Sequence, residues 1–133
     1  MKRTILLCLL LAALVSACGG GATSLTGTNW TVTSLSGVQV DPTAAITGVF
    51  GTDGNLTGSG GCNTYTAGYT TSGKDLTISS PVATKMACNE TTDQQESDYF
   101  YLLENSSTYE IKGSTLTIKD STGQTILEYT SAS

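Results

Sequence analysis

The sequence predicts a small domain of the α+β class that is mainly β, with an antiparallel sheet packed on one helix. Thr, Ser and Gly are abundant and charged residues are few, a composition that favours β-structure with many turns. Apolar and polar residues alternate in short runs that turn residues separate, as in strands. One segment, residues 91–104, contains neither Gly nor Pro and has apolar residues near helical spacing.

The alternation of apolar and polar residues, together with the turn residues, predicts where the strands lie. Residues 38–42 indicate a turn, and Asp53-Gly54 is a strong signal for a hairpin. The paired Gly60 and Gly61 predict a bulge or a close approach of the backbone. In chain order, we expect strands over residues 29–35, 46–50, 55–58, 65–69, 76–78, 109–111, 116–118 and 125–129, with an extended run at 82–88.

The helical segment carries its own start signals. Thr92 with Gln95 fits a capping box, and Asp93 and Glu96 suit the positive end of a helix dipole. The sequence therefore predicts a helix over about residues 93–103 that lies against the sheet. The side chains expected to fill the core between helix and sheet are Trp30, Met86, Phe100 and Leu103.

The first residues read as a bacterial lipoprotein signal peptide. Lys2 and Arg3 supply the positive start, and residues 5–15 form an apolar stretch. This stretch is too short to span a bilayer as a helix, which takes roughly 20 apolar residues. Residues 16–18 (Ser-Ala-Cys) resemble the lipobox, in which the cysteine sulfur receives a diacylglycerol and the chain is cut just before it. The alternative is an ordinary secretory signal in which Cys18 is merely present.

This interpretation divides the chain into a signal peptide (residues 1–17), a flexible linker after the lipidated Cys18 (18–24) and a domain (25–131). We expect acyl chains such as palmitate on Cys18 to attach the domain to the membrane, because two or more chains anchor stably. Gly19, rather than Asp, follows the cysteine. In a Gram-negative cell the protein is therefore expected in the outer membrane.

Composition excludes several kinds of function. Removal of residues 1–17 leaves four Lys and 11 acidic residues, which changes the net charge from −5 to about −7. Such a chain has no electrostatic footprint for nucleic acid. The chain contains no His, the commonest general base and metal ligand. A carboxylate pair could serve as acid and base, but capping and solvation explain most of the acidic residues. We therefore expect no cofactor, no metal site and no catalytic residue.

Two cysteines, Cys62 and Cys88, belong to the predicted domain. In an oxidising envelope, the simplest expectation is a disulfide between them that closes a loop of about 26 residues. The alternatives are an unpaired thiol pair and a redox or metal site. The sequence has no Cys-x-x-Cys motif, and neither a His nor a further Cys of the predicted domain is available as a ligand.

Four segments together resemble the signatures of one protein family. They are residues 25–30 (Leu-Thr-Gly-Thr-Asn-Trp), 61–69 (Gly-Cys-Asn-Thr-Tyr-Thr-Ala-Gly-Tyr), 84–88 (Thr-Lys-Met-Ala-Cys) and 111–118 (Ile-Lys-Gly-Ser-Thr-Leu-Thr-Ile). Their order and spacing are similar to those of the META domain, also called HslJ-like. The resemblance implies an open or cracked β-barrel with a helix, found in secreted and lipid-anchored bacterial proteins. It also implies a link to envelope stress and drug tolerance, with no established enzymatic activity.

The resemblance favours a non-enzymatic, lipid-anchored protein that acts by contact in the cell envelope, through an unknown envelope protein. An alternative is a carrier that holds a small hydrophobic or lipid ligand in a barrel cavity. A third hypothesis is a thiol oxidoreductase that uses Cys62 and Cys88. Asn63, Tyr65 and Tyr69 are the candidate ligand or contact residues. Each also has a structural explanation: a turn hydrogen bond for Asn63, and half-buried packing for the two tyrosines.

Overall fold

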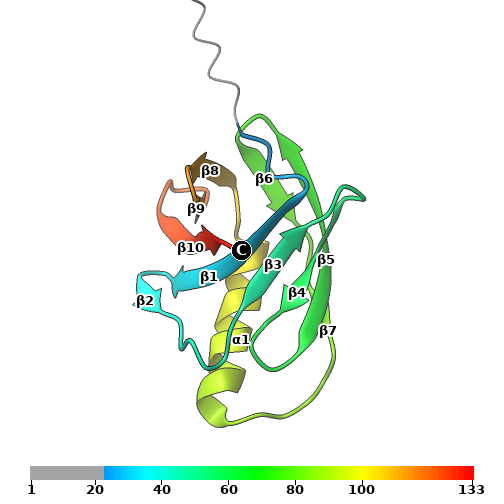
Figure 1. Cartoon of the computed structure of the whole chain (residues 1–133), viewed down its shortest axis with the longest axis vertical. Coiled ribbons are helices and arrows are strands. Elements are labelled where there is room, and N and C mark those ends of the chain that lie inside the picture. Colours follow the sequence, from blue (N-terminus) through cyan, green and yellow to red (C-terminus); the bar gives the residue numbers. More distant parts are fainter. Residues whose placement is uncertain (1–22) are drawn as a thin grey trace, which may run out of the picture.

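The structure, a computed structural model, describes residues 23–133 and contains ten strands and one helix within that range (Figure 1). The predicted signal peptide and Cys18 lie outside the described residues. Within residues 23–133, no helix is long and apolar enough to cross a membrane. The strands are β1 (Thr28–Leu35), β2 (Val38–Gln39), β3 (Thr47–Phe50), β4 (Asn55–Ser59), β5 (Thr64–Ser72), β6 (Asp75–Ile78), β7 (Val82–Ala83), β8 (Thr108–Lys112), β9 (Thr115–Lys119) and β10 (Thr125–Ser131), and the helix is α1 (Glu90–Glu104).

The strands form one antiparallel sheet that curves into a ring. Their order is β10-β9-β8-β6-β5-β4-β3-β1-β2, with β7 beside β5. Because β1 also pairs with β10, eight of the strands close on themselves. Strand pairing around the ring is weakest between β6 and β8, where Asp75 opposite Thr108 is the single paired position. The predicted fold class is therefore confirmed: a mainly β, cracked ring with one helix, which is not a true barrel.

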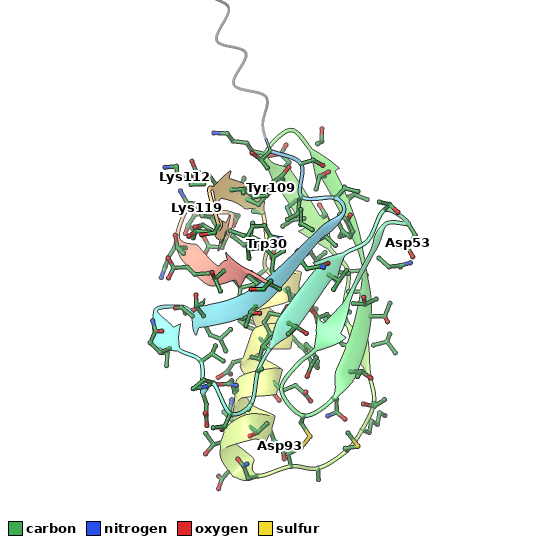
Figure 2. The ribbon with its side chains drawn as sticks, in the orientation of Figure 1. Trp30, Asp53, Asp93, Tyr109, Lys112 and Lys119 are labelled. Carbon is green, nitrogen blue, oxygen red and sulfur yellow. A yellow bond between two sulfur atoms is a disulfide. The ribbon has the colours of Figure 1, made fainter. Side chains whose placement is uncertain are left out.

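The core lies between the curved sheet and α1. Alternation along the longer strands buries one face of each, including Trp30 of β1 (Figure 2). On the helix, Tyr99 and Leu103 are fully buried, and Phe100 is half-buried against the same core. The helix contacts both β1 and β6, which are not neighbours in the sheet. It therefore packs against separate parts of the ring.

The helix begins earlier than predicted, at Glu90 rather than near residue 93. The cap is Asn89, whose backbone is extended and whose side-chain oxygen accepts a hydrogen bond from the Thr92 N–H at 2.9 Å. Gln95, expected in a capping box with Thr92, instead accepts a hydrogen bond from the Asp41 N–H at 3.0 Å. A tertiary contact therefore takes the side chain that the local pattern assigned to the cap.

The prediction that Met86 fills the core is wrong, since 61% of this residue is exposed. The backbone of Met86 is tied to Asn63: its N–H donates to Asn63 Oδ1 at 2.7 Å, and its carbonyl accepts from Asn63 Nδ2 at 3.2 Å. This attachment holds the segment on the surface. Of the extended run expected at 82–88, Val82–Ala83 is a strand.

Residues 38–42, expected as a turn, include the short strand β2. Val38 and Gln39 pair with Leu35 and Ser34 of β1. The turn is formed by Ser36 and Gly37, whose φ angles are 47° and 85°. Two successive positive φ values are what a type I′ hairpin requires. This hairpin carries β2 toward α1 and so forms one wall of the groove described below.

Candidate functional site

Gly60 and Gly61, at the start of the 61–69 signature segment, lie directly against the helix. A Cβ atom at Gly60 would lie 2.6 Å from Glu96 Oε2 and 2.8 Å from Phe100 Cζ. Gly61 has a φ of 109°, a conformation that other residues rarely adopt. The predicted close approach of the backbone is therefore confirmed, and its partner is α1 rather than another strand.

Glu96 holds this loop to the helix, and sequence reasoning missed that role. Glu96 Oε2 accepts hydrogen bonds from the N–H groups of Cys62 (3.1 Å) and Asn63 (2.6 Å). Its Oε1 accepts from Asn63 Nδ2 at 2.6 Å, and the residue is 7% exposed. A signal was available, because Glu96 has helical spacing from Tyr99 and Leu103. A carboxylate on the buried stripe of a helix needs a hydrogen-bonding partner.

Asn63, a candidate contact residue, is buried and uses its whole side chain inside the domain. Its Nδ2 donates to Glu96 Oε1 and to the Met86 carbonyl. Its Oδ1 accepts from Thr84 Oγ1 at 2.9 Å and from the Met86 N–H at 2.7 Å. Two donated and two accepted bonds fill the capacity of an amide. Asn63 thus joins three segments: the loop before β5, the segment after β7, and α1.

Tyr65 and Tyr69, the other two candidates, point into the core from β5. The hydroxyl of Tyr65 donates to the Thr47 carbonyl at 2.9 Å and lies 2.7 Å from that of Tyr99. The Tyr129 hydroxyl lies 3.4 Å from that of Tyr99. Desolvation by burial raises the pKa of all three tyrosines of this chain of hydroxyls. They are therefore neutral hydrogen-bonding groups in the folded domain near neutral pH.

Tyr69 lies further along β5, with its ring edge-on to Phe50. Its hydroxyl donates to the Gly51 carbonyl at 2.6 Å and lies 3.2 Å from the Thr26 hydroxyl oxygen. Both tyrosines are buried. Their hydroxyl groups bind the β3–β4 region and the start of the domain to β5.

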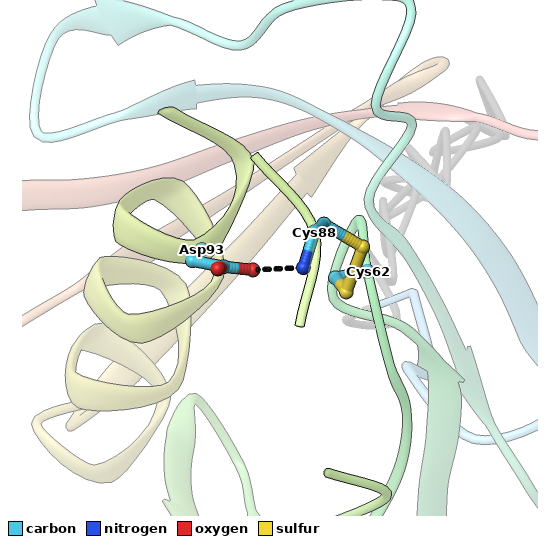
Figure 3. A group of neighbouring side chains, drawn as sticks. All are labelled: Cys62, Cys88 and Asp93. Atoms are coloured by element: carbon cyan, nitrogen blue, oxygen red, sulfur yellow. Dashed lines mark hydrogen bonds between the residues drawn. A yellow bond between two sulfur atoms is a disulfide. The ribbon is translucent and has the colours of Figure 1, made fainter. Parts of the chain in front are cut away.

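The predicted disulfide between Cys62 and Cys88 is present, with a Cα–Cα distance of 6.0 Å (Figure 3). Beside it, the Asp93 carboxylate accepts a hydrogen bond from the Cys88 N–H at 3.0 Å. The two sulfurs and this carboxylate lie within 4.8 Å of one another, a separation that could suit a metal ion. Disulfide sulfurs are not thiolates, and the thiolate is the form that ligates metals. The disulfide and the Asp93 hydrogen bond instead have a structural effect: together they link the loop before β5 to the start of α1.

Three further carboxylates of the described domain lie in separate turns. Asp53 lies between β3 and β4 (Figure 2), and Asp41 and Asp120 occupy two other turns. The pKa of each is lowered, chiefly by a hydrogen bond from a side chain two residues further on: Asn55, Thr43 and Thr122, respectively. They are ionised turn residues, far from the raised pKa that a general acid needs.

An open groove of about 830 Å³ lies between β2 and α1. Val38 on one wall and Tyr101 on the other are large apolar residues that remain 70% and 68% exposed. Gln95 joins the two walls: its Oε1 accepts from the Asp41 N–H, and its Nε2 donates to the Ala44 carbonyl at 3.2 Å. Such a groove with exposed apolar walls is the type of surface that binds another molecule.

The charges along the groove have one sign. Asp41, Glu90 and Asp98 line it, and no Lys or Arg is among its described lining residues. A second hollow, of about 670 Å³, lies beside β5 and β7 and includes Val82, which is 76% exposed. Its lining contains no ionisable side chain except the buried Tyr65. The groove between β2 and α1, hereafter the β2–α1 groove, is therefore the better candidate site.

Comparison with known proteins identifies the class. The profile of the META domain matches residues 23–133, and this chain belongs to the META domain family. No curated protein matches the chain. The META domain is not known as a catalytic family, and the arrangement of side chains described above adds no catalytic constellation within residues 23–133.

Solved structures share the fold at low sequence identity. A solution structure of a protein from Burkholderia xenovorans superposes with a TM-score of 0.66 and 22% identity, covering 82% of this chain and 84% of that one. A second solution structure has a TM-score of 0.60 and 22% identity, with 78% and 88% covered. A crystal structure of a DUF4847 family protein from Bacteroides vulgatus gives a TM-score of 0.52 and 18% identity, covering 64% and 57%.

Proposed function

We propose that this chain is a lipid-anchored protein of the bacterial cell envelope whose META domain acts by contact with another protein. Cys18 would carry the acyl chains, after removal of residues 1–17. The domain would contribute to envelope integrity and to tolerance of stress or drugs. In a Gram-negative cell, Gly19 after the lipidated cysteine favours the outer membrane.

The observation that carries the contact function is the β2–α1 groove with Val38 and Tyr101 exposed. Folding normally buries such side chains, and their exposure on two facing walls leaves a surface suited to a partner. By contrast, the polar groups of Asn63 and Glu96 are occupied within the domain. Their hydrogen bonds support a structural role for the signature segments and leave the groove as the exposed feature.

Carriage of a hydrophobic ligand inside the ring is less well supported. Phe50, Tyr99 and Tyr129 are at most 1% exposed and occupy the interior together with the buried aliphatic side chains. Small rings of strands are usually filled in this way. A ligand there would have to displace a packed core.

The anchor is tested by replacing the cysteine that should carry it. We expect Cys18→Ala to abolish incorporation of a fatty-acid label and to move the protein out of the membrane fraction or leave it unprocessed. Cys8→Ala is the matched control, because Cys8 lies in the apolar stretch and should leave with the signal peptide. A Cys18→Ala protein that is still labelled and still membrane-bound would refute the anchor.

The contact function is tested in cells that lack the protein. Wild-type protein should restore growth under envelope stress, and a Val38→Thr, Tyr101→Ser variant should be present at normal levels but fail to restore it. Val82→Thr is the control, since Val82 is equally exposed but lies outside the groove. Equal rescue by the groove variant would contradict the proposal.

A further inference from the structure

The β2–α1 groove combines an apolar stripe with an acidic rim, and this combination restricts the chemistry of its occupant. The apolar lining comes from both walls, with Val38 and Val40 on the β2 side and Tyr101 and Leu102 on the helix. The carboxylates Asp41, Glu90 and Asp98 lie along the same groove. An occupant that complements both must present apolar side chains and positive charge together.

The carboxylates of the rim are free to attract such a charge. In the described part of the chain, Asp41 accepts its hydrogen bonds from Thr43, and Asp98 accepts one from Gln94, all neutral donors. The low pKa of Asp41, caused by the Thr43 hydrogen bonds, keeps it ionised. Lys112 and Lys119 lie on the β8–β9 hairpin, at the opposite end of the domain from Asp93 in the first turn of α1 (Figure 2). No lysine lines the groove to neutralise its rim.

One wall of the groove also offers backbone groups. Val38 pairs with Leu35, and the Val40 N–H donates to the Thr33 carbonyl at 3.1 Å. In an antiparallel pair, alternate residues direct their N–H and C=O groups to opposite sides. Gln39, between these two bonded positions, therefore directs its groups away from β1. β2 is the last strand in the sheet order, so an extended segment can be added at this edge.

We propose that the β2–α1 groove binds an extended, basic and apolar segment of another envelope protein. The segment places alternate apolar side chains between Val38 and Tyr101, and its lysines or arginines face Glu90 and Asp98. Its backbone bonds to the outer side of Gln39. This inference rests on the proposed contact function and names the chemistry of the partner.

The test uses the processed full chain in a non-ionic detergent and a short fluorescein-labelled peptide of alternating lysine and valine. Binding is followed by fluorescence anisotropy. We expect saturable binding that weakens steeply between about 0.05 and 0.5 M salt, since exposed charge pairs are screened. Matched peptides of alternating glutamate and valine, and of lysine and serine, should not bind. Equal binding by the glutamate peptide would overturn the proposal.

Paired variants locate the site. We expect Val38→Thr to weaken the peptide about three- to tenfold, and Glu90→Gln and Asp98→Asn about two- to fivefold each. The control for Val38 is Val82→Thr, and the control for the charges is Glu104→Gln at the end of α1, which is exposed and outside the groove. Wild-type affinity in all three groove variants would overturn the inference.

Two other occupants are separate outcomes. If a neutral hydrophobic dye binds and is displaced by lipid while the basic peptide does not bind, the groove is a lipid site and the inference is wrong. If sedimentation shows a dimer that Val38→Thr dissociates, a second copy covers the groove and the inference is again wrong. Neither result affects labelling of Cys18, so failure here is distinguishable from failure of the proposed anchor.

Discussion

Replacement of Glu96 by Gln should destabilise the domain although the side chain keeps its size. The Glu96 carboxylate accepts three hydrogen bonds, two from backbone N–H groups and one from Asn63 Nδ2. Gln has one acceptor oxygen and one donor nitrogen. If that oxygen keeps the two backbone bonds, the amide nitrogen faces the Asn63 amide nitrogen, so one bond is replaced by an encounter between two donors.

The magnitude follows from the kind of bond that is lost. A hydrogen bond to a charged group contributes about 1.5–3 kcal/mol, and removal of the charge also weakens the two bonds that remain. We therefore expect Glu96→Gln to lower the free energy of unfolding by about 2–3 kcal/mol. Glu96→Ala, which removes all three bonds, should cost about 4–5 kcal/mol. That value is less than a simple sum, because water can reach the half-exposed Cys62.

Urea unfolding measures this loss of unfolding free energy. It is followed by the fluorescence of Trp30, which is buried and is the one Trp of the chain. The slope m should stay constant while the midpoint falls. Glu104→Gln is the matched control on the exposed end of the same helix and should change stability by less than about 0.5 kcal/mol. If Glu96→Gln unfolds at the same urea concentration as Glu104→Gln, the carboxylate does not hold the loop and the reasoning fails.

Other changes test the same architecture. Gly60→Ala should lower stability by about 1–3 kcal/mol, because the new methyl group meets the Glu96 carboxylate and the Phe100 ring, and calorimetry of the purified variant measures this loss. Reduction of the Cys62–Cys88 disulfide, whose cysteines are 26 positions apart, should lower the free energy of unfolding by about 3–4 kcal/mol. A Cys62→Ala, Cys88→Ala protein is the control, and its urea unfolding should be the same with and without reductant. The folded pKa of Tyr99 is raised by burial, so the unfolded chain releases its proton first as pH rises. The contribution of Tyr99 to stability should therefore be constant below about pH 10 and be lost above it, and a urea midpoint that does not fall between about pH 10 and pH 11 would be contrary to this expectation.

Features that depend on neighbouring residues could be predicted from the sequence. Alternation identified the long strands, and Asp53-Gly54 identified the hairpin between β3 and β4, where Gly54 has a φ of 80°. The glycine pair at 60 and 61 indicated a close backbone approach. The cysteine count, together with the expected oxidising compartment, indicated the disulfide. Each signal lies within a few residues or follows from composition.

Features that depend on distant partners were missed. Glu96 looked like a residue that favours the helix start, because nothing in its own segment shows that the 60–63 loop lies above it. Met86 was expected in the core because its segment alternates, yet the hydrogen bonds to Asn63 hold its backbone at the surface. β2 has two residues and depends on positive φ at Ser36, a conformation that is uncommon outside glycine. The β2–α1 groove is lined by two segments that are distant in sequence, within residues 35–41 and 90–102, and it had no local signature.

The pairing of β1 with β10 has a consequence for how the protein is made. The two strands form a long ladder that runs from Trp30 opposite Ser131 to Leu35 opposite Leu127, so the contacts that close the ring join nearly opposite ends of the described chain. Synthesis proceeds from the N-terminus, so β1 emerges from the ribosome long before its partner. A nascent chain that still lacks β10 cannot complete the ring. The topology thereby delays closure of the ring until almost the last residue has been made.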